Sequence, residues 1–321
     1  MPILTSTYRP PIVFRQPDVA TIYSGRVRRV EGVTQIRERL ELSDGDFLDV
    51  DWTYSNQKTK RCVILLHGLE GSAKRPYILG VAKHFTAHGY DACAMNYRGC
   101  GEEDNRLYAT YHSAKKDDLH TVVEHVIEQG YQEIVLNGFS MGGNISLYYA
   151  GTTPHIPKEI KAVIAVSTPC DLGGCSQRLL SKRNFVYSFN FLRSLKKKIR
   201  HKQELFPELL TKEQINAIQN LKEFDDVYTS KAHGFKDADD YYRRCSSLPV
   251  LKNITLPVLL LNARNDSFLS KSCYPYKLAK KMPNLYLETP QHGGHVAFVD
   301  KNNLYYNEKR ALEFANTYCS Q

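Results

Sequence analysis

Residues 134–143, which read IVLNGFSMGG, decide the fold of this chain. The first three residues of this stretch predict a buried strand, and a helical pattern begins at Asn144. Between strand and helix, Gly138 and Gly142 each lie two residues from Ser140. A turn this sharp leaves no room for side chains at the two glycine positions. The pattern therefore predicts that the Ser140 hydroxyl is held out at the carboxyl end of a sheet strand.

Strand-like apolar runs alternate with helix-length segments on both sides of this turn. The predicted strands span residues 37–42, 47–53, 61–66, 91–96, 133–137, 160–166, 256–262 and 285–289. The predicted helices span residues 77–88, 115–129, from 142 onward, and 304–318. Such alternation is typical of an α/β fold, with a mostly parallel central sheet and helices on both faces.

The alternation of strands and helices is interrupted once. After residue 168 the pattern is helical and lacks buried-strand runs, so we expect residues 169–247 to form an inserted helical cap. Residues 36–168 and 248–321 then form the α/β core, and 321 residues suffice for one large domain with an insertion. Residues 1–35 carry four prolines and little periodicity, which predicts an N-terminal extension lying over the core.

A serine hydroxyl needs a base that removes its proton, and the base needs an acid that orients it. Asp266 is the only carboxylate in the loop 262–268, so we expect it to be the acid, with helix capping as the alternative role. After the next strand, His292 and His295 compete for the role of base. We favour His295, because it follows a double glycine in a loop that leads into the last helix. We expect His292 to brace that loop by hydrogen bonding.

Acyl transfer through a tetrahedral intermediate needs two backbone N–H groups that point at the oxyanion. We expect one from Met141, the residue after the serine. The other is expected from Leu69, in the loop HGLEG at residues 67–71. His67 comes before the serine and the acid in the chain, whereas the base follows both in this arrangement. We therefore expect His67 to shape the loop.

Several motifs together resemble the YheT-like α/β-hydrolases, which are related to ABHD-type lipid esterases and to yeast medium-chain ester synthases. These motifs are HGLEG (67–71), NYRGCG (96–101), GFSMGG (138–143), EFDD (223–226), YY (241–242) and HGGH (292–295). They extend over most of the chain and are more specific together than the serine turn alone. The resemblance implies the α/β-hydrolase fold and maps a catalytic triad onto Ser140, Asp266 and His295. Where such families often show two consecutive acids, this chain has Asn265 before Asp266.

These residues predict a serine carboxylesterase that works through an acyl-enzyme. The resemblance implies short- to medium-chain acyl esters as its small-molecule substrates. An alcohol acyltransferase, a phospholipase or another lipid esterase would use the same triad, and an acyltransferase would differ in how well it excludes water. A non-catalytic binding protein on the same scaffold is a further alternative. We expect no cofactor and no metal, since the sequence contains neither G-x-G-x-x-G nor C-x-x-C.

Cysteine usage and apolar runs bear on the location of the protein. The eight cysteines are scattered, so we expect buried free thiols in a reducing compartment. The first ten residues lack an apolar segment of signal-peptide length, and no apolar run is long enough to span a bilayer. These features predict a cytoplasmic protein.

The formal charge of +9 has a local origin. Residues 172–203 contain nine basic and no acidic residues, which leaves the rest of the chain without net charge. An apolar stripe of helical spacing in this segment comprises Phe185, Phe189, Leu192, Leu195 and Ile199, and the cations beside it are Arg193, Lys196, Lys197, Lys198 and Arg200. The pattern predicts either a cap helix that packs on the core with solvated lysines, or a transient contact with an anionic membrane surface. We expect no nucleic-acid partner, since no stacking aromatics accompany a known motif.

Two further motifs have both a structural and a functional interpretation. Arg98 follows a strand at the edge of the sheet, where it either touches the substrate or stabilises its own loop. The acidic run at residues 223–226 is compatible with a metal site, but we expect a helix start within the cap.

Overall fold

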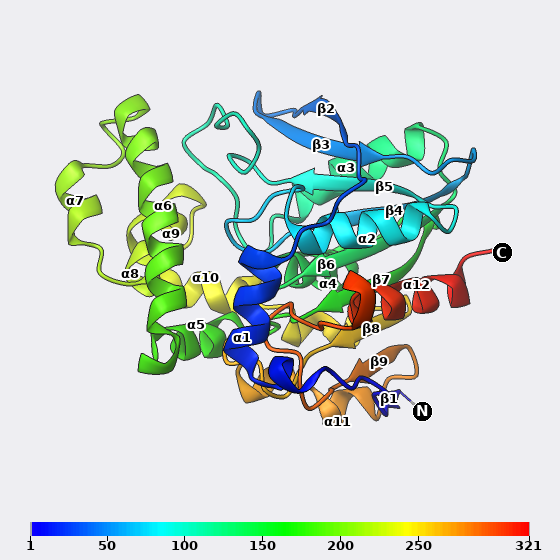
Figure 1. Ribbon diagram of the computed structural model, residues 1–321. Helices are drawn as coiled ribbons and strands as arrows, with labels where there is room; N and C mark the ends of the chain where they lie inside the picture. The colour runs from blue at the N-terminus through cyan, green and yellow to red at the C-terminus, as the bar shows by residue number, and fades with distance from the viewer. Residues whose placement is uncertain (1, 321) are drawn as a thin grey trace.

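The centre of the computed structural model, which describes residues 2–320, is a nine-stranded sheet (Figure 1). Its strand order is β1-β9-β8-β7-β6-β4-β5-β3-β2. The strands are β1 (Ile3–Leu4), β2 (Ile36–Glu41), β3 (Phe47–Thr53), β4 (Arg61–Leu66), β5 (Asp91–Asn96), β6 (Glu133–Phe139), β7 (Ile160–Val166), β8 (Val258–Leu261) and β9 (Leu285–Glu288). In this spatial order, every neighbouring pair from β1 across to β5 is parallel. The last two pairs, β5 with β3 and β3 with β2, are antiparallel. The predicted α/β fold is therefore confirmed.

Helices cover both faces of this sheet (Figure 1). Helices α2 (Pro76–Thr86) and α12 (Tyr306–Tyr318) contact each other on one face. Helices α3 (Lys116–Glu128) and α4 (Met141–Thr152) contact each other on the opposite face. The central strands β4, β6, β7 and β8 are covered on both sides, and their sequences are mostly apolar, as is typical of parallel sheets.

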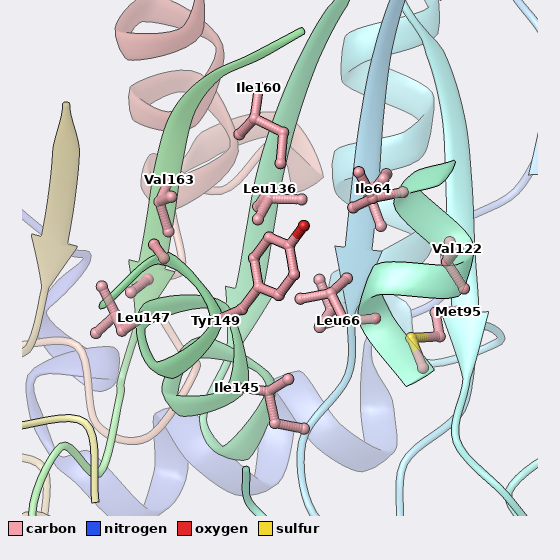
Figure 2. Close-up of a cluster of buried hydrophobic side chains, with 14 of the residues drawn as sticks. Ile64, Leu66, Met95, Val122, Leu136, Ile145, Leu147, Tyr149, Ile160 and Val163 are labelled. Carbon is pink, nitrogen blue, oxygen red and sulfur yellow. The ribbon is translucent and has the colours of Figure 1, made fainter. Parts of the chain in front are cut away.

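Successive strand residues divide the core into two apolar layers, since they point to opposite faces of the sheet. Along β4, Ile64 and Leu66 belong to the layer beneath α3 and α4, whereas Val63 and Leu65 belong to the layer beneath α2 and α12. Figure 2 shows the first layer, in which Tyr149 of α4 packs among the strand side chains. Burial of each such large apolar side chain contributes about 1.5–3 kcal/mol.

The N-terminal segment contributes to the sheet, which the sequence pattern did not predict. Ile3 of β1 lies opposite Leu287 of β9 in a parallel pair. A strand of two residues shows no alternation, and its partner lies far away in the chain. Helix α1 (Pro17–Ile22) follows, and the buried Arg28 side chain then forms an ion pair with Glu308 at 2.6 Å. The segment is thus fixed to the core at several points.

Between β7 and β8 the described chain forms helices and no strand. The α-helices are α5 (Leu172–Leu180), α6 (Phe185–Leu205), α7 (Lys212–Ala217), α8 (Leu221–Phe224), α9 (Ser230–Ala232) and α10 (Ala238–Cys245). Helices α6 to α9 stand beside the sheet, at the end toward which β5 points (Figure 1). Leu195 and Ile199 of α6 pack with Phe224 and Tyr228 in a separate apolar cluster. We call residues 169–247 the helical insertion, and these boundaries remain a prediction.

Two expectations from the sequence concern the cysteines and membrane-spanning helices. All eight cysteines are buried, and none of them forms a disulfide. Within residues 2–320, every helix is too short or too polar to cross a lipid bilayer.

Candidate active site

Ser140 lies at the turn between β6 and α4 in a strained backbone conformation. Its φ of 52° and ψ of −119° are values that non-glycine residues avoid, at a cost of about 1–3 kcal/mol. A Cβ on Gly138 would lie 2.2 Å from the carbonyl oxygen of Gly142. A Cβ on Gly142 would lie 2.4 Å from the carbonyl oxygen of Leu66. Both positions therefore require glycine, and the turn holds Ser140 at the carboxyl end of β6.

A continuous chain of hydrogen bonds links Ser140, His295 and Asp266. The His295 Nε2 atom lies 2.9 Å from Ser140 Oγ, and its Nδ1 atom lies 2.8 Å from Asp266 Oδ2. The three residues follow β6, β9 and β8, whose carboxyl ends meet at one edge because the strands are parallel. The structure thus brings together the three side chains that the sequence predicts to form a triad.

The two candidate histidines have different surroundings. Among the described residues, only His295 contacts both Ser140 and Asp266. The His292 Nδ1 atom lies 3.3 Å from the carbonyl oxygen of Arg15, so this ring ties its loop to the N-terminal segment. The second oxygen of Asp266 accepts the N–H of Phe268 at 2.9 Å, which is a local turn bond. Asp266 therefore holds its own loop and the His295 ring at the same time.

The N-terminal segment positions the loop that carries His295. The Thr21 hydroxyl of α1 accepts the backbone N–H of His295 at 3.0 Å, and Asn265 Oδ1 accepts that of Gly294 at 3.0 Å. The next residue, Val296, has a φ of 55° and donates its N–H to Ser167 Oγ at 2.9 Å. Sequence reasoning missed Thr21, since no pattern in the N-terminal segment points to a partner 274 residues away.

The backbone N–H groups of Leu69 and Met141 have no protein acceptor within residues 2–320. Met141 is the first residue of α4, where an N–H has no acceptor inside the helix. Leu69, Met141 and Ser140 line the same cavity. The loop approaches the serine closely, since a Cβ on Gly68 would lie 3.2 Å from the Ser140 Cβ. Both N–H groups can therefore donate to a ligand.

His67 is completely buried beneath the loop 67–71. Its Nδ1 atom lies 2.8 Å from the carbonyl oxygen of Gly68, and its Nε2 atom accepts the N–H of Tyr97 at 3.3 Å. These contacts assign the ring proton to Nδ1. Burial lowers the pKa of His67 to about 3, so the ring is neutral near pH 7. His67 has the surroundings of a residue that shapes the loop.

Glu70 connects the loop 67–71 to the helical insertion. Its Oε1 atom accepts hydrogen bonds from Lys198 Nζ at 2.7 Å and from the Tyr111 hydroxyl at 2.6 Å. Its Oε2 atom accepts one from the Ser194 hydroxyl at 2.6 Å. Burial acts to raise the pKa of Glu70, but the positive charge of Lys198 and the hydrogen bonds outweigh it and lower the pKa. Glu70 is thus a carboxylate anchored to α6.

Two lysines of α6 point into the protein, which corrects one sequence interpretation. The interpretation as a packed cap helix includes solvated lysines, yet Lys198 is paired with Glu70 and Lys202 is completely buried. Lys202 Nζ donates to the carbonyl oxygen of Leu107 at 2.7 Å. Helical spacing alone cannot reveal this, because the acceptors come from loops of the α/β core.

A cavity of about 580 Å³ lies above Ser140 and His295. The core, the helical insertion and the N-terminal segment all contribute to its wall. Many of the side chains that line it are apolar, among them Leu179, Phe191 and Ile22. A cavity of this size, with apolar walls and a few placed polar groups, is typical of a small-molecule site.

Asp225 places a carboxylate in the wall of this cavity. It accepts hydrogen bonds from the Thr229 hydroxyl at 2.7 Å and the Tyr242 hydroxyl at 2.6 Å. Burial raises its pKa to about 6. In the same acidic run, Glu223 accepts the backbone N–H of Gln219 at 2.6 Å at the start of α8. Within residues 2–320, no group of three or more His, Cys, Asp or Glu side chains is arranged to hold a metal ion.

Arg98 is surrounded by three aspartates of the α/β core. Its guanidinium group is buried and bonds to Asp118 at 2.7 Å, to Asp44 at 2.6 Å and to Asp46 at 3.3 Å. It does not belong to the cavity wall formed by the described residues. Of its two interpretations, stabilisation of the loop is therefore the one that the contacts favour.

Comparison with known proteins identifies the family. Residues 61–302 match the family described as alpha/beta hydrolase fold. The chain is 32% identical over 300 residues to the Escherichia coli protein named "Putative esterase YheT", covering 91% of this chain and 87% of that one. It is 28% identical over 308 residues to human phospholipase ABHD3, covering 93% and 75%.

A solved structure supports the fold alone. The esterase Pf2001 of Pyrococcus furiosus matches with a TM-score of 0.60 at 18% identity, covering 91% of this chain and 96% of that one. The family match spans most of the chain, and the identity to the Escherichia coli protein extends over nearly its whole length. The chain therefore belongs to the YheT-like α/β-hydrolases.

Proposed function

We propose that this protein is a serine carboxylesterase with Ser140 as nucleophile, His295 as general base and Asp266 as the residue that orients the base. The observation that carries the proposal is the pair of contacts at 2.9 and 2.8 Å that joins the three side chains beside the cavity. With the Nδ1 proton donated to Asp266, the Nε2 atom of His295 is free to accept the serine proton. The esterase name of the similar Escherichia coli protein supports this reaction class.

The proposed reaction has two stages. Ser140 Oγ attacks the ester carbonyl carbon while His295 takes its proton, and the N–H groups of Leu69 and Met141 donate to the oxyanion. His295 then protonates the alcohol oxygen as the bond between carbon and oxygen breaks, which leaves an acyl-enzyme. A water molecule that loses its proton to His295 attacks the acyl carbon. Ser140 recovers that proton as the carboxylic acid leaves.

We propose short- to medium-chain acyl esters as the substrates. A cavity of about 580 Å³ with apolar walls suits an acyl chain together with a small alcohol group.

A lipid ester is the second candidate substrate. Two relatives carry the names phospholipase ABHD3 and monoacylglycerol lipase ABHD2. Ile22 and Val186, which line the cavity, are also exposed on the surface.

A panel of p-nitrophenyl esters of increasing acyl length tests the proposal with the wild type and Ser140→Ala. We expect a maximum at short to medium chains, and a loss of roughly 10⁴–10⁶-fold in kcat for Ser140→Ala. A fluorophosphonate probe should label the wild type and leave Ser140→Ala unlabelled. Undiminished turnover by Ser140→Ala would refute the nucleophile. Formation of an ethyl ester in place of free acid, when ethanol is added, would identify an acyltransferase.

A further inference from the structure

Two segments beside the cavity expose apolar side chains. On the N-terminal segment these are Ile12, Val13, Val19 and Ile22, and on the start of α6 they are Phe185, Val186 and Phe189. We call these seven residues the apolar rim. Helix α1 and the start of α6 are joined directly, since Asp18 accepts hydrogen bonds from Arg183 at 2.7 Å and from the Tyr187 hydroxyl at 3.1 Å. The two parts of the rim therefore belong to one region of the surface.

The apolar stripe of α6 divides into two parts along the helix. Leu195 and Ile199 are buried in the cluster of the helical insertion, as a packed cap helix requires. Phe185 and Phe189, in contrast, are 66% and 55% exposed. Their rings stack on each other, with the ring centroids 6.2 Å apart. Packing within the helical insertion therefore accounts for the second half of the stripe and leaves Phe185 and Phe189 in water.

The apolar rim continues into the cavity. Ile22 is 48% exposed and Val186 is 66% exposed, and both also line the cavity that holds Ser140. The exposed apolar surface and the cavity that holds Ser140 therefore share two apolar side chains. Such an arrangement is useful when the substrate comes from an apolar phase.

The segment that contributes Phe185, Val186 and Phe189 to the rim carries only positive charges. Arg178, Lys182, Arg193 and Lys197 are exposed on α5 and α6 or between them, and residues 172–203 contain no acidic side chain. The nearby carboxylate of Asp18 is paired with Arg183. Cations around exposed aromatic and aliphatic side chains match the chemistry of an anionic lipid surface.

We propose that the apolar rim docks on an anionic lipid bilayer and aligns the mouth of the cavity with it. Phe185 and Phe189 insert at the level of the acyl boundary, and the cations around them pair with lipid head groups. Lys198 and Lys202 take no part in this contact, because both are directed into the protein. The docking is a binding property of the surface and does not depend on Ser140 being the nucleophile.

Co-sedimentation of the full chain with vesicles tests the proposal. The vesicles are pure phosphatidylcholine or phosphatidylcholine mixed with phosphatidylserine. The test variant is Phe185→Ser with Phe189→Ser, neither of which lines the cavity. Its matched control is Leu205→Ser with Leu209→Ser, which removes side chains that are 53% and 54% exposed at and beyond the far end of α6.

We expect the wild type to bind the mixed vesicles, with an affinity that falls as salt is added. The test variant should bind about tenfold or more weakly, and the control should bind like the wild type. Hydrolysis of a soluble short-chain ester should be unchanged in both variants, which separates a docking defect from a catalytic or folding defect.

Three outcomes would overturn the proposal. The first is no binding of the wild type to mixed vesicles. The second is equal binding by the test variant and the control. The third is a wild-type dimer in solution that the test variant converts to a monomer, since the rim would then be an interface between two copies of the chain.

Discussion

Lys198 Nζ lies 2.7 Å from Glu70 Oε1, and this ion pair joins helix α6 to the loop that carries Leu69. Glu70 has a φ of 53°, which is strained for a residue with a side chain. A lysine of the helical insertion thus fixes the carboxylate of Glu70, the residue that follows Leu69. A proposed oxyanion donor of the core therefore depends on the position of α6.

Replacement of Lys198 by Met should lower kcat about tenfold and change KM less. The loop would lose its anchor, so the Leu69 N–H would be aimed less well at the oxyanion. The free energy of unfolding should fall by about 3 kcal/mol, because Glu70 would keep a mostly buried charge without its cation. Steady-state kinetics and urea unfolding measure both effects. Lys197→Met, an exposed neighbour on the same helix, is the control, and equal effects from both variants would contradict the coupling.

Substitution of the two histidines separates their roles. His295→Ala should reduce kcat by roughly 10⁴-fold or more, because Ser140 loses the group that accepts its proton. His292→Ala should stay within about tenfold of the wild type, since it removes only a contact to the Arg15 carbonyl oxygen. Hydrolysis of the preferred p-nitrophenyl ester measures both. A reversed order of the two effects would show that the base has been assigned wrongly.

Gly142 and Gly173 are both the second residue of a helix, α4 and α5, and they should respond differently to alanine. The Gly142→Ala methyl group would lie 2.4 Å from the Leu66 carbonyl oxygen, so the serine turn must distort. We expect a loss of about 3 kcal/mol in the free energy of unfolding and a loss of fluorophosphonate labelling. The Gly173→Ala methyl group finds its nearest neighbours at 3.8 Å, so labelling should persist and stability should change by less than about 1 kcal/mol. Normal labelling of Gly142→Ala would contradict the steric argument.

Acid should destabilise the protein through His67. Burial lowers its pKa from 6.5 to about 3 in the folded state. Between these two values the unfolded chain binds a proton that the folded protein does not. Stability from this group is therefore present above about pH 6.5 and is lost as the pH falls toward 3, with a slope of up to about 1.4 kcal/mol per pH unit.

Urea unfolding of the wild type and of His67→Asn at several pH values between 7 and 4 measures this contribution. The difference between the two free energies of unfolding should shrink as the pH falls, because the variant lacks the titrating ring. Other titrating groups contribute equally to both proteins and cancel. A difference that does not vary with pH would mean that the ring is already protonated in the folded protein or is not buried in solution.

Much of the site could be predicted because its chemistry follows local patterns. The strand, the two glycines and Ser140 form one continuous stretch whose turn stereochemistry is local. Asp266 and His295 follow other strands, and parallel strands bring their carboxyl ends to one edge. A choice between His292 and His295 could be argued from their places in the loop, but only the folded chain shows which ring reaches the serine.

The contacts that cross between distant segments could not be predicted. The pairing of β1 with β9 and the bond from His295 to Thr21 join residues more than 250 positions apart. The pairing of Lys198 with Glu70 has the same character, because helical spacing cannot show which lysine meets a carboxylate from another loop. In the basic amphipathic helix α6, some of the charged side chains are therefore buried, whereas Phe185 and Phe189 are exposed.

The amino-acid sequence by itself determined the class of the fold and the set of side chains available for the chemistry. Periodicity and turn stereochemistry are properties of neighbouring residues, so they can be recognised in an unfolded chain. The tertiary structure alone decided which charges are buried, which apolar residues stay in water and which N-terminal group supports the loop of His295. These depend on packing between segments, where burial and contact arise only when the whole chain has folded.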